Sequence, residues 1–367
     1  MPFCLRKCPY CDFYSVSDLS LRAAFIDALI REMEMAGDPH FHFDTLYLGG
    51  GTPSVFDAED IGRITERVRQ MFRPAPDIEV SLEVNPGTAT PEKLRNYSGA
   101  GVNRLSIGVQ SFQDANLSFL GRIHSGKDAM LALQWARAAG FENIGIDLIC
   151  GIPGQTRKSW LSDLQNAVEW EPAHISCYTL TYERGTAMDD QRQKGEIYPL
   201  PEGRAADMFE LTTDFLEQQA YQQYEISNFA RSGAERSRHN QKYWNHVPYL
   251  GFGPSAHSFD GGFCRSWNYY SVDKYIQIVR EGKPPTEKKE HLTREQQMTE
   301  AVYLGLRKTA GIDLREFRKK FGSDFYGLFG EKAELLQKEG FVRMEQDRFA
   351  LTRKGMLFFD SIAAMLI

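Results

Sequence analysis

Short apolar, β-branched runs alternate along the first part of the chain with longer segments in which apolar residues recur at helical spacing. The runs recur about every 25–35 residues and are bounded by Gly, Pro, Asn or Asp, as strands usually are. Strands and helices that alternate in this way form parallel sheets with right-handed crossovers. The pattern therefore predicts an α/β fold, either a barrel or an open doubly wound sheet. The predicted strands are residues 45–48, 78–84, 104–109, 144–149 and 174–180, and the predicted helices are 19–36, 57–72, 91–100, 127–139, 157–170 and 207–219.

The pattern changes after residue 220. Residues 221–267 are rich in Asn, His, Tyr, Gly and Pro, which predicts a strand followed by functional loops, and 282–286 is a candidate linker. Three helices and a two-strand hairpin follow, which together describe a winged-helix-like unit. We therefore divide the chain into residues 1–220, 221–285 and 286–367. The predicted C-terminal elements are helices 293–308, 314–321 and 331–339, strands 341–344 and 348–351, and a final helix.

Composition places the chain in the ordinary globular class. Its 367 residues allow two or three cores, and 42% of them are hydrophobic and 25% charged. No apolar run approaches the ~18 residues of a membrane span, and the N-terminal residues lack the charged-then-apolar pattern of a secretory signal, so we expect no export. Six scattered cysteines do not form an export-type disulfide framework. We therefore expect a cytoplasmic protein.

Charge argues against a nucleic-acid partner. The net charge is −6, and residues 286–367 carry nearly equal numbers of basic and acidic side chains. Proteins that bind nucleic acids neutralise phosphates with an excess of Lys and Arg. The winged-helix-like unit is therefore expected to pack against the rest of the chain, and a DNA-binding regulator is the least favoured alternative.

Cys4, Cys8 and Cys11 form a Cys-x3-Cys-x2-Cys run. Three thiolates on one loop can each bind a different iron of one [4Fe-4S] cube, and one iron then stays open to an outside ligand. A structural zinc site would need a fourth ligand, but the nearest candidates, His40 and His42, lie about 30 residues on without ligand-pair spacing. A disulfide loop is the other alternative, and the spacing favours the cluster.

The cysteine run resembles that of the radical S-adenosylmethionine (SAM) superfamily. The resemblance implies that the open iron chelates the amino and carboxylate groups of SAM, and that the fold is a partial TIM-type (β/α)6 barrel. In that family a strand precedes the cysteine loop, whereas only Met1, Pro2 and Phe3 stand there in this sequence. We therefore expect the first barrel strand to be missing.

Polar residues follow several predicted strands, at the strand ends where a barrel of this type places its chemistry. Glycines at such an end let the backbone approach a ligand, and a buried carboxylate requires a polar partner. Taken singly, each residue could be no more than a satisfied strand-end group. Together they match the SAM-contacting set of the coproporphyrinogen dehydrogenase-like branch, which implies the same role here. The residues are Gly50, Gly51, Thr52, Glu83, Gln110, Arg122 and Asp147.

One position near the cysteine run distinguishes the members of this branch. The coproporphyrinogen dehydrogenases carry a further cysteine two residues after the third, and Phe13 stands there in this sequence. The run Cys11-Asp12-Phe13 is similar to that of HemW-type heme chaperones.

A second feature is the His-Asn-x-x-Tyr-Trp run of His239, Asn240, Tyr243 and Trp244. In HemW-type chaperones this motif is associated with heme binding. A neutral imidazole is a common axial ligand of heme iron, and aromatic rings can lie against a porphyrin. The resemblance makes His239 the first candidate for an iron ligand. A histidine in such a loop is otherwise more often packed and hydrogen-bonded than metal-bound.

Several neighbouring residues are further candidates. Arg236 and Arg238 could meet the heme propionates, and His246 and His257 are alternative ligands.

These observations predict a heme chaperone that binds heme, a [4Fe-4S] cluster and SAM and transfers heme to acceptor proteins. Membrane-bound respiratory hemoproteins are candidate acceptors, and peripheral contact with a membrane stays open. The competing function is that of an oxygen-independent coproporphyrinogen III dehydrogenase or another radical SAM enzyme that modifies a tetrapyrrole. Whether the protein is an enzyme is therefore left open.

Overall fold

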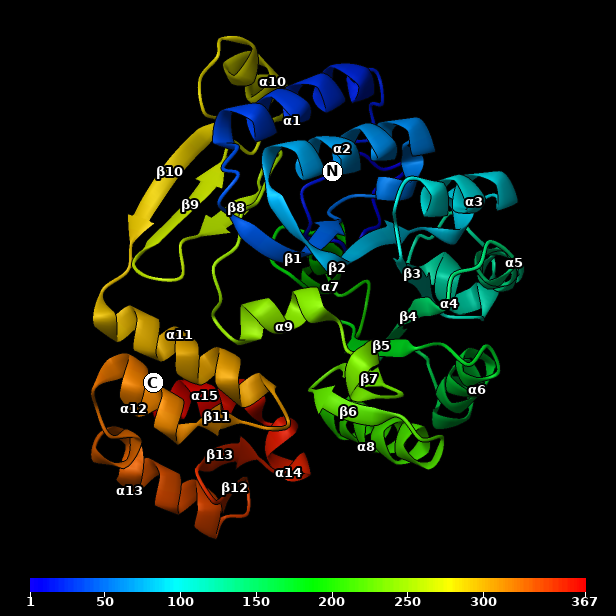
Figure 1. The fold of residues 1–367 in the computed structure, drawn as a ribbon. Helices are drawn as coiled ribbons and strands as arrows, with labels where there is room; N and C mark the ends of the chain where they lie inside the picture. Colours follow the sequence, from blue (N-terminus) through cyan, green and yellow to red (C-terminus); the bar gives the residue numbers. More distant parts are fainter.

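The structure is a computed structural model that describes all 367 residues. Its main sheet has seven strands in the order β1-β2-β3-β4-β5-β7-β6, of which β1 to β5 are parallel and β7 and β6 antiparallel. The sheet curves into an open half-barrel (Figure 1). The strands are β1 His42–Leu48, β2 Arg73–Val84, β3 Arg104–Gln110, β4 Asn143–Cys150, β5 His174–Thr179, β6 Gln222–Glu225 and β7 Asn228–Ala230.

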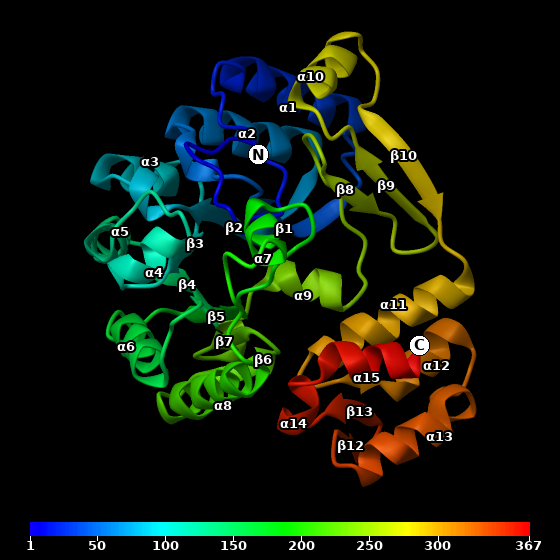
Figure 2. The same cartoon turned by 180° about the vertical axis from the view of Figure 1, so that it is seen from behind.

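Helices cover the convex side of this sheet. Figures 1 and 2 show α2, α3, α5, α6 and α8 outside the arc of strands. Their apolar faces join the outward side chains of the strands in a cluster of 45 buried residues. The helices of this region are α1 Arg22–Ala36, α2 Ala58–Met71, α3 Pro91–Gly99, α4 Asp114–Phe119, α5 Gly126–Ala138, α6 Arg157–Val168, α7 Ala187–Gln193 and α8 Glu202–Gln218, with short 3-10 turns η1 Pro53–Val55 and η2 Pro86–Thr88.

The concave face of the sheet has a different chemistry. Side chains alternate between the two faces along a strand, so the apolar Val80, Leu82 and Val84 of β2 pack into the core while Glu79 and Glu83 lie on the other face. This polar inner face is where a ligand site can be built.

One short helix lies on the concave side. Helix α9 (Arg238–Trp244) follows the turn η3 (Gly233–Glu235) and packs against β1 and against α11. Figures 1 and 2 show it inside the arc of strands. The His-Asn-x-x-Tyr-Trp run therefore forms a helix on the concave side of the half-barrel.

The middle of the chain forms an antiparallel three-stranded sheet of β8 His257–Phe259, β9 Cys264–Asn268 and β10 Thr286–His291. Helix α10 (Val272–Arg280) packs on α1. Because β10 pairs with β9, residues 286–291 belong with this sheet, and the expected linker at 282–286 leads directly into a strand.

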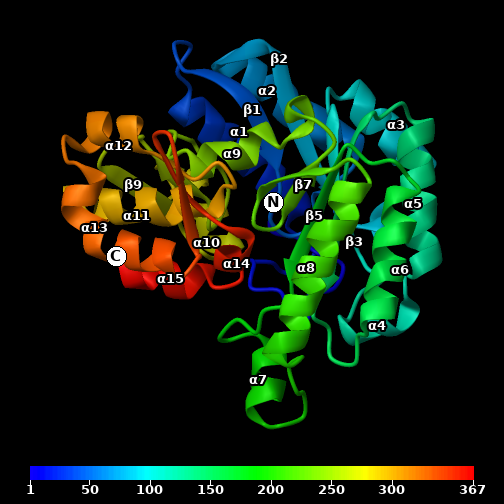
Figure 3. The ribbon, with the colours of Figure 1, turned by 90° about the horizontal axis from the view of Figure 1, so that it is seen from below.

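The C-terminal residues form a separate winged-helix-like unit with its own cluster of 16 buried side chains. It lies on the open side of the half-barrel (Figure 3). The predicted helix at 331–339 begins earlier, at Phe325, because the Asp324 side chain accepts a hydrogen bond from Gly327 and caps it there. The elements are α11 Arg294–Arg307, β11 Ile312–Asp313, α12 Leu314–Phe321, α13 Phe325–Lys338, β12 Val342–Glu345, β13 Arg348–Leu351, α14 Arg353–Met356 and α15 Phe359–Leu366.

The predicted partial barrel with a winged-helix-like tail is confirmed. The structure has five parallel β/α units where six were expected, because the segment after α8 forms the antiparallel pair β6 and β7. At the other edge, Met1 and Phe3 accept backbone hydrogen bonds from Gly51 and Thr52.

No helix combines the length and apolar character that a bilayer crossing requires.

Candidate functional site

Cys4 lies beside the glycine-rich end of β1. Its Sγ accepts a hydrogen bond from Thr52 Oγ1 at 3.2 Å, and the residue is only 8% exposed. Thr52, predicted to contact SAM, therefore also orients the first cysteine. All six cysteines of the chain are free thiols.

Cys8 and Cys11 lie in the same loop, next to Arg122. The Arg122 guanidinium donates to Cys8 Sγ at 3.6 Å, to Tyr10 OH at 3.5 Å and to Gly108 O at 2.8 Å. The guanidinium therefore places a positive charge beside the cysteine loop. Burial raises the pKa of the Cys11 thiol. A positively charged group at the site would offset that cost.

No three His, Cys, Asp or Glu side chains converge closely enough to hold a single ion. A cubane cluster sets a different requirement, because each thiolate binds its own iron.

Glu83 lies at the end of β2, facing the glycine-rich turn after β1. Its carboxylate accepts hydrogen bonds from Tyr47 OH at 2.7 Å and from Gly50 N at 3.1 Å. Gly50 has φ +114°, which favours glycine, and a Cβ on Gly51 would lie 2.9 Å from Phe3 O. Burial raises the pKa of Glu83 to about 7. A ligand ammonium placed here would stabilise the ionised carboxylate.

Gln110 and Asp147 continue this row across β3 and β4. Gln110 adopts φ +66° at the end of β3, and its Oε1 is buried without a hydrogen-bond partner. Asp147 Oδ2 accepts a hydrogen bond from Ser106 Oγ at 2.8 Å, and burial raises its pKa. Arg122 Nε is also buried without a partner. Unpaired buried polar atoms are uncommon in folded proteins, so these atoms fit a polar ligand such as SAM.

His239 projects from α9 onto β1. Its Nδ1 lies 3.1 Å from Thr45 Oγ1 and its Nε2 lies 3.0 Å from Tyr243 OH. The imidazole also stacks on the Tyr47 ring, with centroids 4.7 Å apart and 18° between planes. Burial lowers the pKa of His239 to about 4, so the ring is neutral at pH 7. Neutral imidazole is the form that binds a metal.

A buried carboxylate fixes the start of α9. Glu79, on the inner face of β2, accepts hydrogen bonds from the backbone N–H groups of Arg238 at 3.2 Å and His239 at 3.1 Å. Arg104 lies 3.9 Å from the same carboxylate. The first N–H groups of a helix need such acceptors. Glu79 therefore holds the helix that carries His239 against the sheet.

The other residues in and beside the His-Asn-x-x-Tyr-Trp run contact different parts of the molecule. Trp244 packs edge-on against Tyr224, with ring centroids 5.7 Å apart, and the backbone N–H of Asn240 donates to Ser237 Oγ. Arg238 forms an ion pair with Asp77 at 3.0 Å, so its guanidinium is already paired.

The other basic candidates lie in different surroundings. Arg236 lies over the Tyr224 ring at 5.4 Å. His246 bridges Glu300 and Lys320 of the C-terminal unit, and His257 stacks on Trp267. The structure therefore brings only His239 of the three candidate ligands next to the Glu83 end of the sheet.

Three residues of this site were missed by sequence reasoning: Thr45, Tyr47 and Glu79. The signal was present as polar residues at alternate positions of two strands, but nothing in the sequence indicated that α9 would lie on that face.

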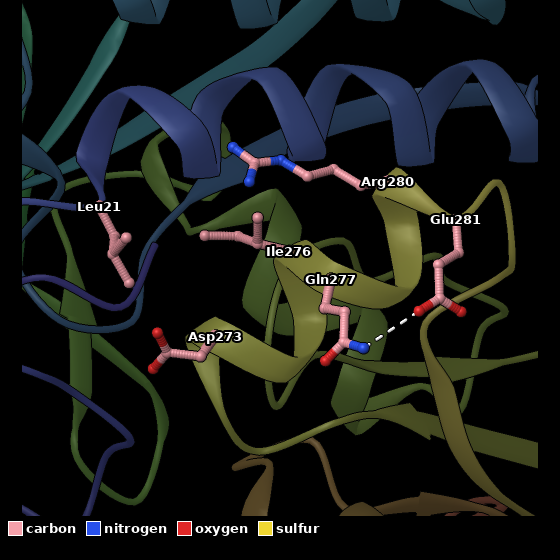
Figure 4. Close-up of a pocket in the computed structure, with 6 residues that line it drawn as sticks. All are labelled: Leu21, Asp273, Ile276, Gln277, Arg280 and Glu281. Carbon is pink, nitrogen blue, oxygen red and sulfur yellow. Dashed lines mark hydrogen bonds between the residues drawn. The ribbon is translucent and has the colours of Figure 1, made fainter.

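A separate surface hollow of about 350 Å³ lies between the start of α1 and α10 (Figure 4). Charged and polar side chains form most of its wall, and Gln277 donates to Glu281, one turn further along at the end of α10, at 3.1 Å. None of the predicted cofactor-binding residues lines it.

Comparisons with known proteins agree with this arrangement. Residues 1–167 match the radical SAM superfamily, and residues 292–358 match the HemN C-terminal domain. The chain is 36% identical to the heme chaperone HemW of Bacillus subtilis, over 99% of this chain and 96% of that protein. It is 34% identical to HemW of Lactococcus lactis, over 97% and 92%. Coproporphyrinogen III oxidase (HemN) from Escherichia coli, described as a radical SAM enzyme, superposes with a TM-score of 0.85 at 27% identity, over 100% of this chain and 88% of that chain.

Proposed function

This chain belongs to the radical SAM superfamily, in the family that includes the bacterial heme chaperone HemW, and we propose that it binds a [4Fe-4S] cluster, SAM and heme and passes heme to acceptor proteins. A heme-related function follows from the HemW relatives and the HemN neighbour. The observation that supports the finer proposal is that the neutral, half-buried imidazole of His239, on α9, packs against β1, the strand whose end carries the glycine-rich turn.

Cys4, Cys8 and Cys11 would hold the cluster. Thr52 orients the Cys4 thiol, and the Arg122 guanidinium donates a hydrogen bond to Cys8 Sγ. When bound, a cluster with one open iron supplies a coordination site for SAM and an electron. The chain's own contribution is to exclude other ligands from the loop and to keep the thiols oriented.

The row of residues along the strand ends would hold SAM. Glu83 and the carbonyl groups of Gly50 and Gly51 suit the methionine ammonium, since they are acceptors on a backbone without Cβ atoms. Gln110 and Asp147 offer acceptors for the ribose hydroxyl groups. Arg122 Nε, which is buried and unpaired, suits the methionine carboxylate.

His239 would bind the heme iron through Nε2. Nδ1 is directed at Thr45 Oγ1, and such an outer hydrogen bond orients a ligating imidazole. Tyr243, which is 39% exposed, and Trp244 offer aromatic surface for the porphyrin. Asn240 would contribute polar contacts.

A transfer experiment tests the proposal. Heme-loaded protein, reconstituted anaerobically, is mixed with membrane vesicles from heme-depleted cells that contain apo-forms of respiratory cytochromes. We expect heme absorbance to move from the protein to the vesicles, and a Cys4/Cys8/Cys11 triple Ala variant to transfer more slowly. Equal transfer by the triple variant would remove the cluster from the proposal.

The competing function is supported by the HemN superposition. Oxidative decarboxylation of coproporphyrinogen III would yield protoporphyrinogen when the reconstituted protein is incubated with that substrate, SAM and a reductant. The position where the dehydrogenases carry a further cysteine is occupied here by Phe13, whose side chain is 68% exposed. We therefore expect no product at catalytic yield, and its appearance would rule out a pure carrier.

A further inference from the structure

Two side chains on one face of strand β1 contact the candidate binding sites for heme and for SAM. Thr45 and Tyr47 are two residues apart and so point to the same side of the sheet. Thr45 Oγ1 lies 3.1 Å from His239 Nδ1, and the Tyr47 ring stacks on the same imidazole. The hydroxyl at the far end of Tyr47 donates to Glu83 Oε1 at 2.7 Å. One rigid side chain therefore contacts both candidate sites.

The Tyr47 hydroxyl acts as a hydrogen-bond donor to the Glu83 carboxylate. Its partner Glu83 accepts only one other hydrogen bond, from Gly50 N. The strength of the Tyr47 bond consequently depends on what else meets this carboxylate.

We infer that Tyr47 is a positioning residue that couples SAM binding at Glu83 to heme binding at His239. This inference rests on the proposed function and adds a route between its two sites. An ammonium at Glu83 holds the carboxylate ionised, which makes the Tyr47 hydrogen bond charge-assisted and stronger. The fixed ring then holds the imidazole stacked on it, so less ordering remains when iron binds. SAM therefore tightens heme binding.

The geometry around the imidazole assigns separate tasks to its two nitrogens. Nδ1 is held by Thr45, so Nε2 is the nitrogen left for iron, and coordination there displaces the hydroxyl of Tyr243. Thr45 thus sets the orientation of the His239 ring. Tyr47 makes the rigidity of that ring depend on whether SAM is bound at Glu83.

Coupling of this kind is reciprocal. If SAM tightens heme binding by a given factor, heme tightens SAM binding by the same factor. The test therefore measures both affinities on full-length, anaerobically reconstituted protein. Heme is titrated with and without saturating SAM and followed by absorbance, and SAM is titrated with and without heme by equilibrium dialysis.

For the wild type we expect SAM to lower the heme dissociation constant about fivefold, the low end of typical couplings between sites. Tyr47→Phe keeps the stacked ring but lacks the hydroxyl. Whatever its heme affinity without SAM, both coupling factors of this variant should fall close to one. Tyr221→Phe is the matched control, because the Tyr221 hydroxyl is also buried but donates to Pro172 O on the far edge of the sheet. It should retain the coupling.

Thr45→Val separates orientation from coupling. Loss of the outer hydrogen bond should weaken heme binding by roughly tenfold and shift the electron paramagnetic resonance of ferric heme, while the SAM-dependent factor persists.

Two outcomes overturn the inference: a wild type whose heme affinity ignores SAM, or a Tyr47→Phe variant with unchanged coupling. An unaltered resonance in Thr45→Val would overturn the role given to Thr45. Failure of the wild type to bind heme at all would instead overturn the proposed function, and the inference with it.

Discussion

Gly121 carries one of the tightest local constraints near the cysteine loop. It adopts φ +67°, and a Cβ there would lie 2.6 Å from Pro9 Cδ. Pro9 stands between the second and third cysteines, so any displacement moves the loop that holds them. Gly140 has a similar backbone, at φ +86°, but open space around it.

This contrast gives a prediction for cluster assembly. Gly121→Ala should lower the iron bound after anaerobic reconstitution to less than about half of wild type, because the added methyl group pushes Pro9 and with it Cys8 and Cys11. Gly140→Ala incurs the same backbone strain of about 1 kcal/mol but has no neighbour to displace. It should bind iron normally, and equal iron loss in both variants would contradict the argument.

Glu79 gives a second prediction at the same scale. Glutamine keeps one acceptor oxygen and points an NH2 group at the α9 backbone donors, so Glu79→Gln should cost about 1–2 kcal/mol of helix anchoring. We expect heme affinity to fall roughly tenfold while SAM affinity stays unchanged. Asp128→Asn, which disturbs the cap of α5 on the outer side, is the control and should leave heme affinity intact. A loss of SAM affinity in Glu79→Gln would show that the effect is not confined to α9.

At the scale of elements, one buried carboxylate joins α1 to the middle region. Glu32 of α1 accepts hydrogen bonds from Gly253 N, Asn268 Nδ2 and Tyr275 OH. Burial raises its pKa from an ordinary 4.5 to about 7. The stability that it contributes is therefore full below about pH 4.5 and is lost as the pH rises through 7.

Unfolding by urea at different pH values measures this effect. Between pH 5 and pH 8 the wild type should lose roughly 2.5 kcal/mol more stability than Glu32→Gln, whose amide does not titrate. Comparison with the variant cancels the contribution of all other groups. Parallel pH profiles of the two proteins would show that Glu32 does not titrate in this range.

The elements differ in how far the sequence predicts them. The five parallel strands and the cysteine run are local patterns, and the structure places them where the sequence predicts. Helix α9 was expected as loop, because seven residues with one strong cap give little periodic signal. Its position against β1 depends on Glu79 and Thr45, contacts between residues more than 150 positions apart. Strand β10 was similarly hidden, since Lys and Glu fill most of it and only pairing with β9 makes it a strand.

At the scale of the whole molecule, the winged-helix-like unit is attached to the half-barrel by ion pairs. Arg307 of α11 contacts Glu225 of β6 at 2.5 Å, and that carboxylate is fully buried. Arg353 of α14 pairs with Asp214 and Glu217 of α8 at the surface. Both arginines join the same two parts, but only one neutralises a buried charge.

The two arginines should therefore contribute unequally. Arg307→Ala leaves Glu225 without its cation and should lower the free energy of unfolding by about 3 kcal/mol. Arg353→Ala removes exposed pairs that are worth about 1 kcal/mol at most. Thermal unfolding and limited proteolysis between β10 and α11 measure the difference. Equal destabilisation would mean that burial of Glu225 does not decide how the unit is attached.

We propose above all that this protein holds heme iron through His239, beside a SAM site on the same half-barrel. An anaerobic heme titration followed at the Soret band, comparing wild type with His239→Ala, tests it most directly. We predict a displaced Soret band and an affinity loss of roughly tenfold or more in the variant, with SAM affinity retained. A variant with the wild-type Soret band and heme affinity would contradict the account.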